Sequence, residues 1–471
     1  MPVKIFTHKD QLDFAQLSGD HNPMHVSPVA ARRLMYGKQV VHGVHGLFWA
    51  LNKFTADLGH SVRLISLFAV FQKPIKIDDT VIGYAADISD DGKATIVVYN
   101  GDEIYQKIIL QWEPVSKVAS EGYAKSNTPQ LECKSPGINN IDGISNEFDL
   151  HFNATKGKEM FPMLTRYLAH KQTAQLLAST RLVGMMIPGL NSIYSELELQ
   201  FDEIDEEETR FKYSVSNVIE RFNLVRLHIG CSDAKGSIAA FFRPDSVQQL
   251  SYEEAKTKVN AAAFKDQQVL IIGGSRGIGE VTAKLLAAGG ADVKFTYNSG
   301  RADADQIVAE TENTTTAITY NVLSENNAEV EQLLKTWKPT HLYYYATPFI
   351  ETSDAEDLNE RIYQKFLSFY VTGFEKLMAC LDNQNALPEA VFYPSSAFVS
   401  KAPANLKEYA KAKAEGEAAC KKWEQQHPAV KIYVPRIPKV ATDQTAGLFD
   451  NGNHDTTQVA LNYISKFAAG D

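Results

Sequence analysis

A strand, a glycine-rich turn and a helix follow one another between residues 268 and 288, and this run constrains the fold most. The apolar residues VLII lead into GGSRGIG, and an alanine-rich helix follows. Glycines at 273, 277 and 279 allow a tight turn, close approach of a pyrophosphate and packing of the helix on the sheet. Strands and helices alternate from there to residue 471, which predicts an α/β domain with a doubly wound parallel sheet over residues 265–471.

The residues after the next strand indicate which dinucleotide this turn would bind. The strand DVKFTY is followed by NSGR, with no acidic residue to bind the ribose hydroxyls of NAD. Asn298, Ser299 and Arg301 stand there instead, and Arg276 lies within the glycine turn. These residues favour a 2′-phosphate and therefore NADP(H) over NAD(H). The alternative is that both arginines are ordinary solvated side chains.

A serine, a tyrosine and a lysine near the C-terminal end have the spacing of a proton-transfer site. Tyr409 and Lys413 are four residues apart and share one helical face, and Ser396 lies 13 residues before Tyr409. An ammonium group beside the phenol is expected to lower its pKa, so that it can exchange a proton with an alcohol or ketone. Without this context, a Tyr-x-x-x-Lys pair is more often a surface pair.

Together, the glycine turn and this trio resemble the short-chain dehydrogenase/reductase (SDR) family, which has a Rossmann-type fold. The resemblance implies that Tyr409 is the general acid/base, that Lys413 binds the nicotinamide ribose and that Ser396 positions the substrate carbonyl. It also implies a cofactor site built from Gly273, Ser275, Arg276, Gly277, Ile278, Gly279, Asn298, Ser299, Arg301, Asn321 and Ala346.

The C-terminal region departs from the SDR pattern at four places. Only Ala346 of YYYATP (343–348) fits the usual Asn-Asn-Ala-Gly, and Tyr370 lies near the place of the catalytic Asn. Asn321 replaces an acidic residue that contacts adenine, and Pro435-Arg436 replaces Pro-Gly. The resemblance is therefore to a divergent member of the family.

A second group of chemically active residues lies in the run SGDHNPMH near the N-terminus. Asn22-Pro23 favours a turn, because the residue before proline avoids helical angles, and this turn lets Asp20 and His25 converge. A carboxylate and an imidazole at one water molecule can add it to an enoyl thioester or, in reverse, dehydrate a 3-hydroxyacyl thioester. Taken alone, such a pair is more often a helix cap and a turn histidine.

The wider sequence FAQLSGDHNPMHVSPVAARRLMYGKQVVHGVHGLFWAL resembles the MaoC-like hydratase signature. That family has a Ser-Gly-Asp-x-Asn-Pro-x-His loop, a short helix and a Val-x-His-Gly stretch that opens the central helix of a hotdog fold. The resemblance implies that Asp20 and His25 are the catalytic pair and that Asn22 and Gly43 bind substrate. The free N–H groups at a helix N-terminus suit a developing enolate oxygen, which agrees with the role of Gly43.

The order of predicted elements divides the chain before the α/β domain. Residues 1–115 form the MaoC-like domain, and 116–148, rich in Ser, Asn, Gly and Pro, are predicted to be a linker. Residues 149–250 repeat the order of helix, glycine turn, strand and acidic turn, which predicts a second, α+β hotdog. No catalytic residue is expected between 149 and 245, where the Asp-x-Asn-Pro-x-His loop does not recur. The alternative is an unrelated α+β segment.

Composition limits partners and location. A net charge of −10 argues against nucleic acid as the main partner. The four cysteines are scattered without metal-ligand spacing, so reduced thiols and no metal site are expected. No signal peptide or membrane-spanning run is visible, which predicts a cytoplasmic protein without a membrane partner. Both fold types usually pair, so a homo-oligomer is expected.

The two resemblances share a 3-hydroxyacyl thioester. They predict a bifunctional enzyme that reduces 3-oxoacyl thioesters with NADPH and dehydrates the product, or hydrates in reverse, on CoA or an acyl carrier protein. Two alternatives remain open. The SDR-type region could only bind nucleotide or a partner in a scaffold role, or it could reduce an unrelated ketone or sugar.

Overall fold

The computed structural model describes residues 2–78, 80–116, 131–203, 208–353, 355–447 and 452–469. The chain divides into two compact units, which meet in the sequence between Asp245 and Ser246. Within the described residues, no helix combines the length and apolar character needed to cross a membrane.

The first unit is built on one ten-stranded sheet whose neighbouring strands are all antiparallel. The strand order is β1-β3-β4-β5-β2-β7-β10-β9-β8-β6. The strands are β1 Val3–Ile5, β2 Val62–Phe71, β3 Val81–Ser89, β4 Lys93–Asn100, β5 Glu103–Pro114, β6 Ser145–Asp149, β7 Ser192–Phe201, β8 Arg210–Ile219, β9 Leu224–Cys231 and β10 Ala234–Phe242.

The two halves of this sheet repeat one another. Read outward from the centre, the orders β2-β5-β4-β3-β1 and β7-β10-β9-β8-β6 match strand for strand, and β2 pairs with β7 at Leu67↔Leu199. A 16-residue helix precedes each central strand: α4 (Gly43–Leu58) and α7 (His170–Met185). Their N-caps have nearly identical backbone angles, φ −54° and ψ 131° at His42, φ −55° and ψ 132° at Ala169. The predicted hotdog fold class is confirmed.

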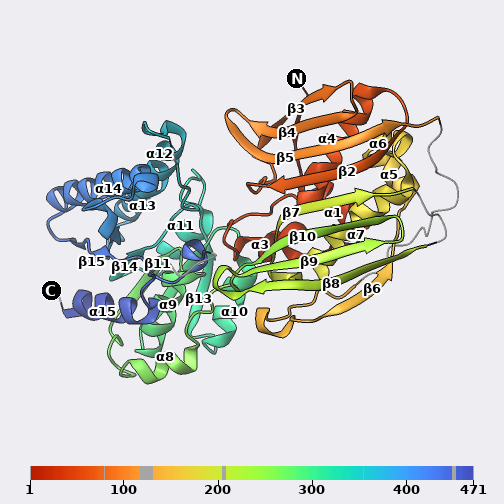
Figure 1. Cartoon of the computed structure of the whole chain (residues 1–471). Coiled ribbons are helices and arrows are strands. Elements are labelled where there is room, and N and C mark those ends of the chain that lie inside the picture. The colour runs from red at the N-terminus through yellow and green to blue at the C-terminus, as the bar shows by residue number, and fades with distance from the viewer. Residues whose placement is uncertain are drawn as a thin grey trace. The chain divides into compact units, whose positions relative to one another are not determined.

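The helices of this unit cover one face of the sheet (Figure 1). Alternation along the strands explains this arrangement, because Ala94, Ile96 and Val98 of β4 are buried while the residues between them are more exposed. The remaining helices are α1 His8–Ser18, α2 Pro23–Val26, α3 Pro28–Arg32, α5 Ala154–Met160 and α6 Pro162–Tyr167.

The segment expected to be a linker contains a strand. Residues 117–130 lie outside the described residues, but β6 begins at Ser145 and pairs with β8 at Phe148↔Phe211. This edge strand, SNEFD, is largely exposed and has no alternation of apolar residues, which explains why its sequence resembles a linker.

The second unit has a six-stranded parallel sheet in the order β13-β12-β11-β14-β15-β17. These strands are β11 Gln268–Ile272, β12 Asp292–Tyr297, β13 Thr315–Thr319, β14 His341–Tyr344, β15 Ala390–Phe392 and β17 Lys431–Tyr433; the short strands β16 Ser395–Ser396 and β18 Arg436–Ile437 form a separate parallel pair. Val269 and Ile271 of β11 enter one core, whereas Leu270 and Ile272 enter another. The sheet is therefore covered on both faces, and the predicted α/β class is confirmed.

Each face has its own helices. One core contains residues of α8 (Tyr252–Lys258), α9 (Gly277–Ala288), α10 (Arg301–Glu310) and α15 (Thr456–Ala469). The other contains residues of α11 (Ala328–Leu334), α13 (Gly373–Asn383) and α14 (Lys407–Gln426). Helix α12 (Glu360–Leu367) packs with α14. In such sheets ligands bind at the carboxyl ends of the strands, where the glycine turn after β11 lies.

Candidate active sites

A tightly held loop carries Asp20 and His25. Helix α1 ends at Gly19, whose φ of 75° turns the chain sharply, and the Ser18 hydroxyl accepts a hydrogen bond from the Asp20 N–H. The Asn22 side chain then caps α2, of which Pro23 is the first residue. The short loop and the capped helix bring Asp20 and His25 to the same pocket.

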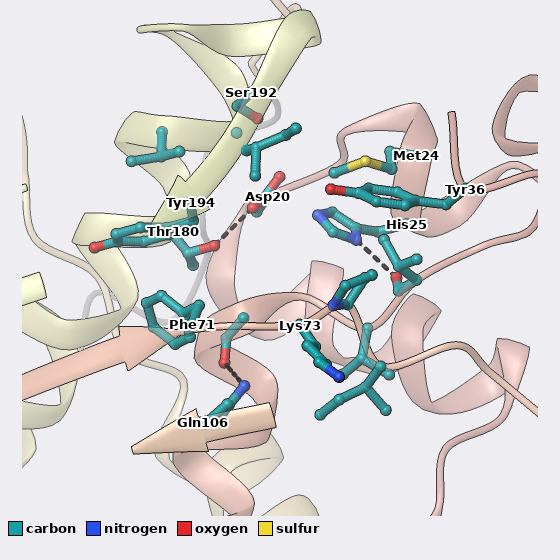
Figure 2. A pocket seen from close by; sticks show the side chains of 18 of the residues that line it. Asp20, Met24, His25, Tyr36, Phe71, Lys73, Gln106, Thr180, Ser192 and Tyr194 are labelled. Atoms are coloured by element: carbon teal, nitrogen blue, oxygen red, sulfur yellow. Dashed lines mark hydrogen bonds between the residues drawn. The ribbon is translucent and has the colours of Figure 1, made fainter. Parts of the chain in front are cut away.

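The two side chains face one another in that pocket (Figure 2). A carboxylate oxygen of Asp20 and a ring nitrogen of His25 lie within 4.8 Å of one another. The His25 Nδ1 lies 2.8 Å from the Val40 carbonyl oxygen, which can only accept, so Nδ1 donates and Nε2 is left as an acceptor. Burial lowers the pKa of His25 to about 3, so the ring is neutral at pH 7. Burial raises the pKa of Asp20, while the interaction with His25 and hydrogen bonds from Thr180 and Asn22 oppose this shift.

The N-terminus of α4 forms another part of the pocket. Gly43 is its first residue and lines the pocket, so the positive end of the helix dipole points at this space. A Cβ atom at Gly43 would lie 3.1 Å from the Phe71 ring, which leaves little room for a side chain. Gln106 donates to the Gly43 carbonyl at 2.9 Å and holds the helix end in place.

His42 supports the loop from behind. Its Nε2 lies 3.0 Å from the Asp20 carbonyl oxygen, its Nδ1 lies 3.0 Å from Gln11 Oε1, and its ring stacks on His25 at 3.9 Å. Asp20, His25 and His42 could in principle surround a metal ion. Both His42 nitrogens already have partners, however, so two ligand groups face the pocket, fewer than protein zinc sites use.

The second half of the sheet contributes to the same pocket. The Thr180 hydroxyl donates to Asp20 Oδ2 at 2.7 Å, and Val183, Gly184 and Tyr194 also line the pocket. Sequence reasoning missed these groups, because the burial of every residue of α7, many of them polar and in need of partners, is visible only in the structure.

Asn22, expected to bind substrate, is placed differently. Its side-chain amide donates to the Gly184 and Gly189 carbonyls, each at 3.0 Å, and its side chain is fully buried. It is not among the described residues that line the pocket. These bonds tie the loop to the end of α7, so Asn22 positions Asp20 and His25 instead of contacting a ligand.

The glycine turn of the second unit has the geometry of a phosphate cradle. Gly273 and Gly277 have φ values of 84° and 57°, which favour glycine. A Cβ atom at Gly279 would lie 2.2 Å from the Gly273 carbonyl oxygen, so the close contact of turn and helix excludes any side chain. A Cβ atom at Gly273 would lie 3.1 Å from the backbone nitrogen of Ala346. Ser275, in the same turn, is buried.

The residues expected to select the 2′-phosphate lie at the surface. Asn298, Ser299 and Arg301 follow β12 and are exposed, and the Arg301 Nε is 3.6 Å from Asp305. Arg276 is the N-cap of α9, and Ile278 packs on the core in its first turn. Asn321 accepts a hydrogen bond from the Leu323 N–H and so stabilises the turn after β13. The glycine turn itself fits the phosphates of a dinucleotide.

The structure brings Ser396, Tyr409 and Lys413 together, with one difference from expectation. The Ser396 side chain lies close enough to Tyr409 to lower the pKa of its phenol. Lys413, also buried, directs its Nζ to the Pro394 carbonyl at 2.8 Å, and burial lowers its pKa to about 7. The pKa of Tyr409 is raised, not lowered as predicted, because burial disfavours the charged phenolate more than the Ser396 side chain favours it.

Tyr370 occupies the neighbourhood expected for an asparagine. It lies on a π-helical turn, Ser368–Thr372, and the Lys413 Nζ sits 4.0 Å from its ring centroid. Its hydroxyl is 2.7 Å from the Thr347 Oγ1, and its ring meets Tyr409 edge-on at 5.8 Å. An aromatic ring therefore faces the Lys413 Nζ at the place where the sequence resemblance led us to expect an amide.

Comparison with known protein families agrees with this division. Residues 2–106 match the MaoC like domain, and residues 267–439 match the short chain dehydrogenase family. A curated relative, the "Probable dehydratase NIT22" of Ajellomyces capsulatus, is 27% identical over 125 residues, which are 26% of this chain and 32% of the relative. The match thus spans about a third of that protein.

Solved structures similar to this chain are short-chain dehydrogenases and related reductases. The oxidoreductase yciK from E. coli is 18% identical, with a TM-score of 0.39, and the match covers 44% of this chain and 91% of that one. A short chain dehydrogenase from Shigella flexneri in complex with NADP is 17% identical, with a TM-score of 0.40. The match covers 44% of this chain and 93% of that one. The 3-ketoacyl-(acyl-carrier-protein) reductase from Brucella melitensis, in complex with NADH, is 19% identical, with a TM-score of 0.38. The match covers 43% of this chain and 91% of that one.

Proposed function

Because residues 2–106 form a MaoC-like dehydratase domain and residues 267–439 a short-chain dehydrogenase domain, we propose that the chain is a bifunctional enzyme of acyl thioesters. Its SDR domain reduces 3-oxoacyl thioesters with NADPH, and its MaoC-like domain dehydrates the (R)-3-hydroxyacyl product or hydrates the enoyl thioester. The observation that carries the proposal is the neutral His25 facing the Asp20 carboxylate at the N-terminus of α4.

In hydration, a water molecule lies between Asp20 and His25. His25 Nε2 accepts one proton of this water while the Asp20 carboxylate accepts a hydrogen bond from the other. The hydroxide adds to C3 of the enoyl group, and C2 takes the proton back from His25, so the site returns to its starting state. The Gly43 N–H at the start of α4 holds the thioester oxygen as negative charge develops on it. Dehydration is the reverse sequence.

In the second unit, the glycine turn from Gly273 to Gly279 would hold the phosphates of NADP(H), with Arg276 and Arg301 near its 2′-phosphate. Bound there, the dinucleotide supplies the hydride chemistry. Tyr409 gives a proton to the alcohol oxygen during reduction, and Ser396 holds that oxygen through its hydroxyl. The pKa of Lys413 near 7 lets it exchange a proton at neutral pH, which suits resupply of Tyr409.

A second candidate function keeps the hydratase and assigns nucleotide or partner binding alone to the SDR domain. The Tyr370 ring supports this alternative, because it faces the Lys413 ammonium that an SDR uses for the ribose. Turnover of NADPH separates the two possibilities. A reductase of an unrelated ketone or sugar would oxidise NADPH with those substrates and leave acetoacetyl-CoA unchanged.

The test follows NADPH absorbance with acetoacetyl-CoA and analyses the acyl products of wild type, Asp20→Asn and Tyr409→Phe. We expect wild type to consume NADPH and form crotonyl-CoA, Tyr409→Phe to lose consumption, and Asp20→Asn to stop at 3-hydroxybutyryl-CoA. Hydration of crotonyl-CoA by Tyr409→Phe is the matched control for folding. If NADPH is untouched while crotonyl-CoA is hydrated, the shared intermediate is ruled out. If crotonyl-CoA is not hydrated either, the hydratase assignment fails too.

A further inference from the structure

Helix α7 belongs to the half of the sheet that has no Asp-x-Asn-Pro-x-His loop, yet it contacts Asp20. The Thr180 hydroxyl lies 2.7 Å from Asp20 Oδ2. A Cβ atom at Gly184 would lie 2.1 Å from Asp20 Oδ1, so the carboxylate rests directly against the helix backbone. Asp20 and Thr180 are 2% and 3% exposed, so both side chains depend on protein partners.

Each oxygen of the Asp20 carboxylate has a different donor. Oδ1 accepts from the Asn22 N–H at 3.2 Å, and Oδ2 accepts from Thr180. A hydroxyl facing an ionised carboxylate must donate to it, and this bond is charge-assisted. The donor to Oδ1 belongs to the loop itself, whereas Thr180 is the donor that links the carboxylate to α7. Thr180 also lines the pocket, as Figure 2 shows.

We propose that Thr180 is a positioning residue for the hydration and dehydration proposed above, and that its hydroxyl fixes the Asp20 carboxylate at the pocket and favours its charged form. The expected effect of Thr180 on catalysis rests on the proposed function. Its structural part, the control of the Asp20 charge by Thr180, can be measured without any substrate.

Several other titratable groups lie around Asp20. They are His21 in the same loop, His25 on α2, His42 at the N-cap of α4 and Cys133 before β6. Burial lowers the pKa of His25 and of His42 to about 3, so both rings are neutral at pH 7. Burial raises the pKa of the Cys133 thiol to about 12. The interaction with His25 and the hydrogen bond from Thr180 both lower the pKa of Asp20 and so oppose the effect of burial.

Two variants and a matched control test the role of this hydroxyl. Thr180→Val removes the hydroxyl and keeps the shape, while Thr180→Ser keeps the hydroxyl. Thr173→Val is the control, because Thr173 is equally buried on α7 but donates to the Ala169 carbonyl within its own helix. Each full-length variant is checked for its melting temperature before comparison.

The first readout is the pH profile of kcat for crotonyl-CoA hydration. Because Thr180 stabilises the charged form, its removal raises the pKa of Asp20, so the acidic limb of Thr180→Val moves to higher pH. We expect kcat at neutral pH to fall on the order of tenfold, as for the loss of one charge-assisted hydrogen bond, with a smaller change in KM. Thr180→Ser should restore both properties, and Thr173→Val should match wild type.

The second readout is the titration of the Asp20 carboxyl carbon by ¹³C NMR on protein labelled at the aspartate side chains, with Asp20→Asn assigning the signal. We expect its midpoint to move upward in Thr180→Val and to return in Thr180→Ser. The proposal would be overturned if the midpoint does not move in Thr180→Val. It would also be overturned if Thr180→Ser does not return the acidic limb of the kcat profile to the wild-type pH. If wild type fails to hydrate crotonyl-CoA while the midpoint still moves, the proposed function fails and the control of Asp20 by Thr180 stands.

Discussion

Gly184 leaves the space that the Asp20 side chain occupies beside α7. Its Cα faces the Asp20 carboxylate so closely that a Cβ atom would lie 2.1 Å from Oδ1 and 2.4 Å from Oδ2. Its carbonyl also accepts the Asn22 amide, so the backbone cannot retreat without losing that bond.

We expect Gly184→Ala to displace Asp20 and to lower kcat for crotonyl-CoA hydration on the order of 100-fold, since small misplacements of reacting groups have effects of this size. The added methyl group should also cost about 1–3 kcal/mol of stability through overpacking, measured by denaturant unfolding. Gly137→Ala is the control, because its nearest neighbour would be the Asn140 side chain at 3.5 Å. Equal activity of Gly184→Ala and wild type would contradict the geometry.

The pair Asp20 and His25 could be predicted from the sequence because both lie within one eight-residue run with a proline-enforced turn. Thr180 could not, since it lies 160 residues away and meets Asp20 only through the packing of α7. The direction of the Tyr409 pKa shift was also beyond the sequence, because it comes from the burial of the phenol in the folded unit.

At the scale of elements, strands with regular alternation and marked turns were predictable. The sequences IGYAADI (82–88), ATIVVYN (94–100) and IYQKIILQW (104–112), separated by short turns, predict antiparallel strands and lie within β3, β4 and β5. The edge strand β6 and the π-helical turn at Ser368–Thr372 were not, because neither produces a periodic apolar pattern. Their formation depends on pairing and packing with distant parts of the chain.

The central strands β2 and β7 together shape the pocket. Phe71 on β2 and Tyr194 on β7 both line it, and their ring centroids are 4.9 Å apart. We expect Tyr194→Ala to open this end and to raise the ratio of kcat/KM for octenoyl-CoA over crotonyl-CoA on the order of tenfold. The ratio is measured by following hydration of both substrates.

Phe68→Ala provides the control for that substitution, because Phe68 is an exposed aromatic residue on β2. It should leave the preference between octenoyl-CoA and crotonyl-CoA as in wild type. If both variants change the ratio equally, the two rings do not limit the acyl chain.

At the scale of the whole molecule, the buried histidines make the stability of the first unit depend on pH. Burial lowers the pKa of His25 and His42 to about 3, whereas the unfolded chain binds these protons below about 6.5. Between these values the unfolded state holds more protons, so the stability of the folded state falls as the pH falls. The raised pKa of Asp20 acts in the opposite direction, over the pH range between its usual value and the raised one.

Each of the two histidines should therefore remove about 2 kcal/mol of stability at pH 5 relative to neutral pH. Hydrogen exchange read out on peptides of α4 and α7 by mass spectrometry would measure this loss in the first unit alone. His42→Gln should reduce the dependence, since one titrating group is gone. A wild-type exchange pattern that stays unchanged between pH 7 and pH 5, after correction for intrinsic rates, would exclude this linkage.

The repeated sheet also has an evolutionary consequence. In a symmetric pair of separate subunits, corresponding positions of the two central helices would have to be the same residue. Aligned from their first residues, Gly184 of α7 corresponds to Asp57 of α4, which accepts a hydrogen bond from the Tyr84 hydroxyl. One residue could not satisfy both environments. Joining the two copies in a single gene releases them from this shared constraint, so that one can retain the reactive loop while the other adapts to support it.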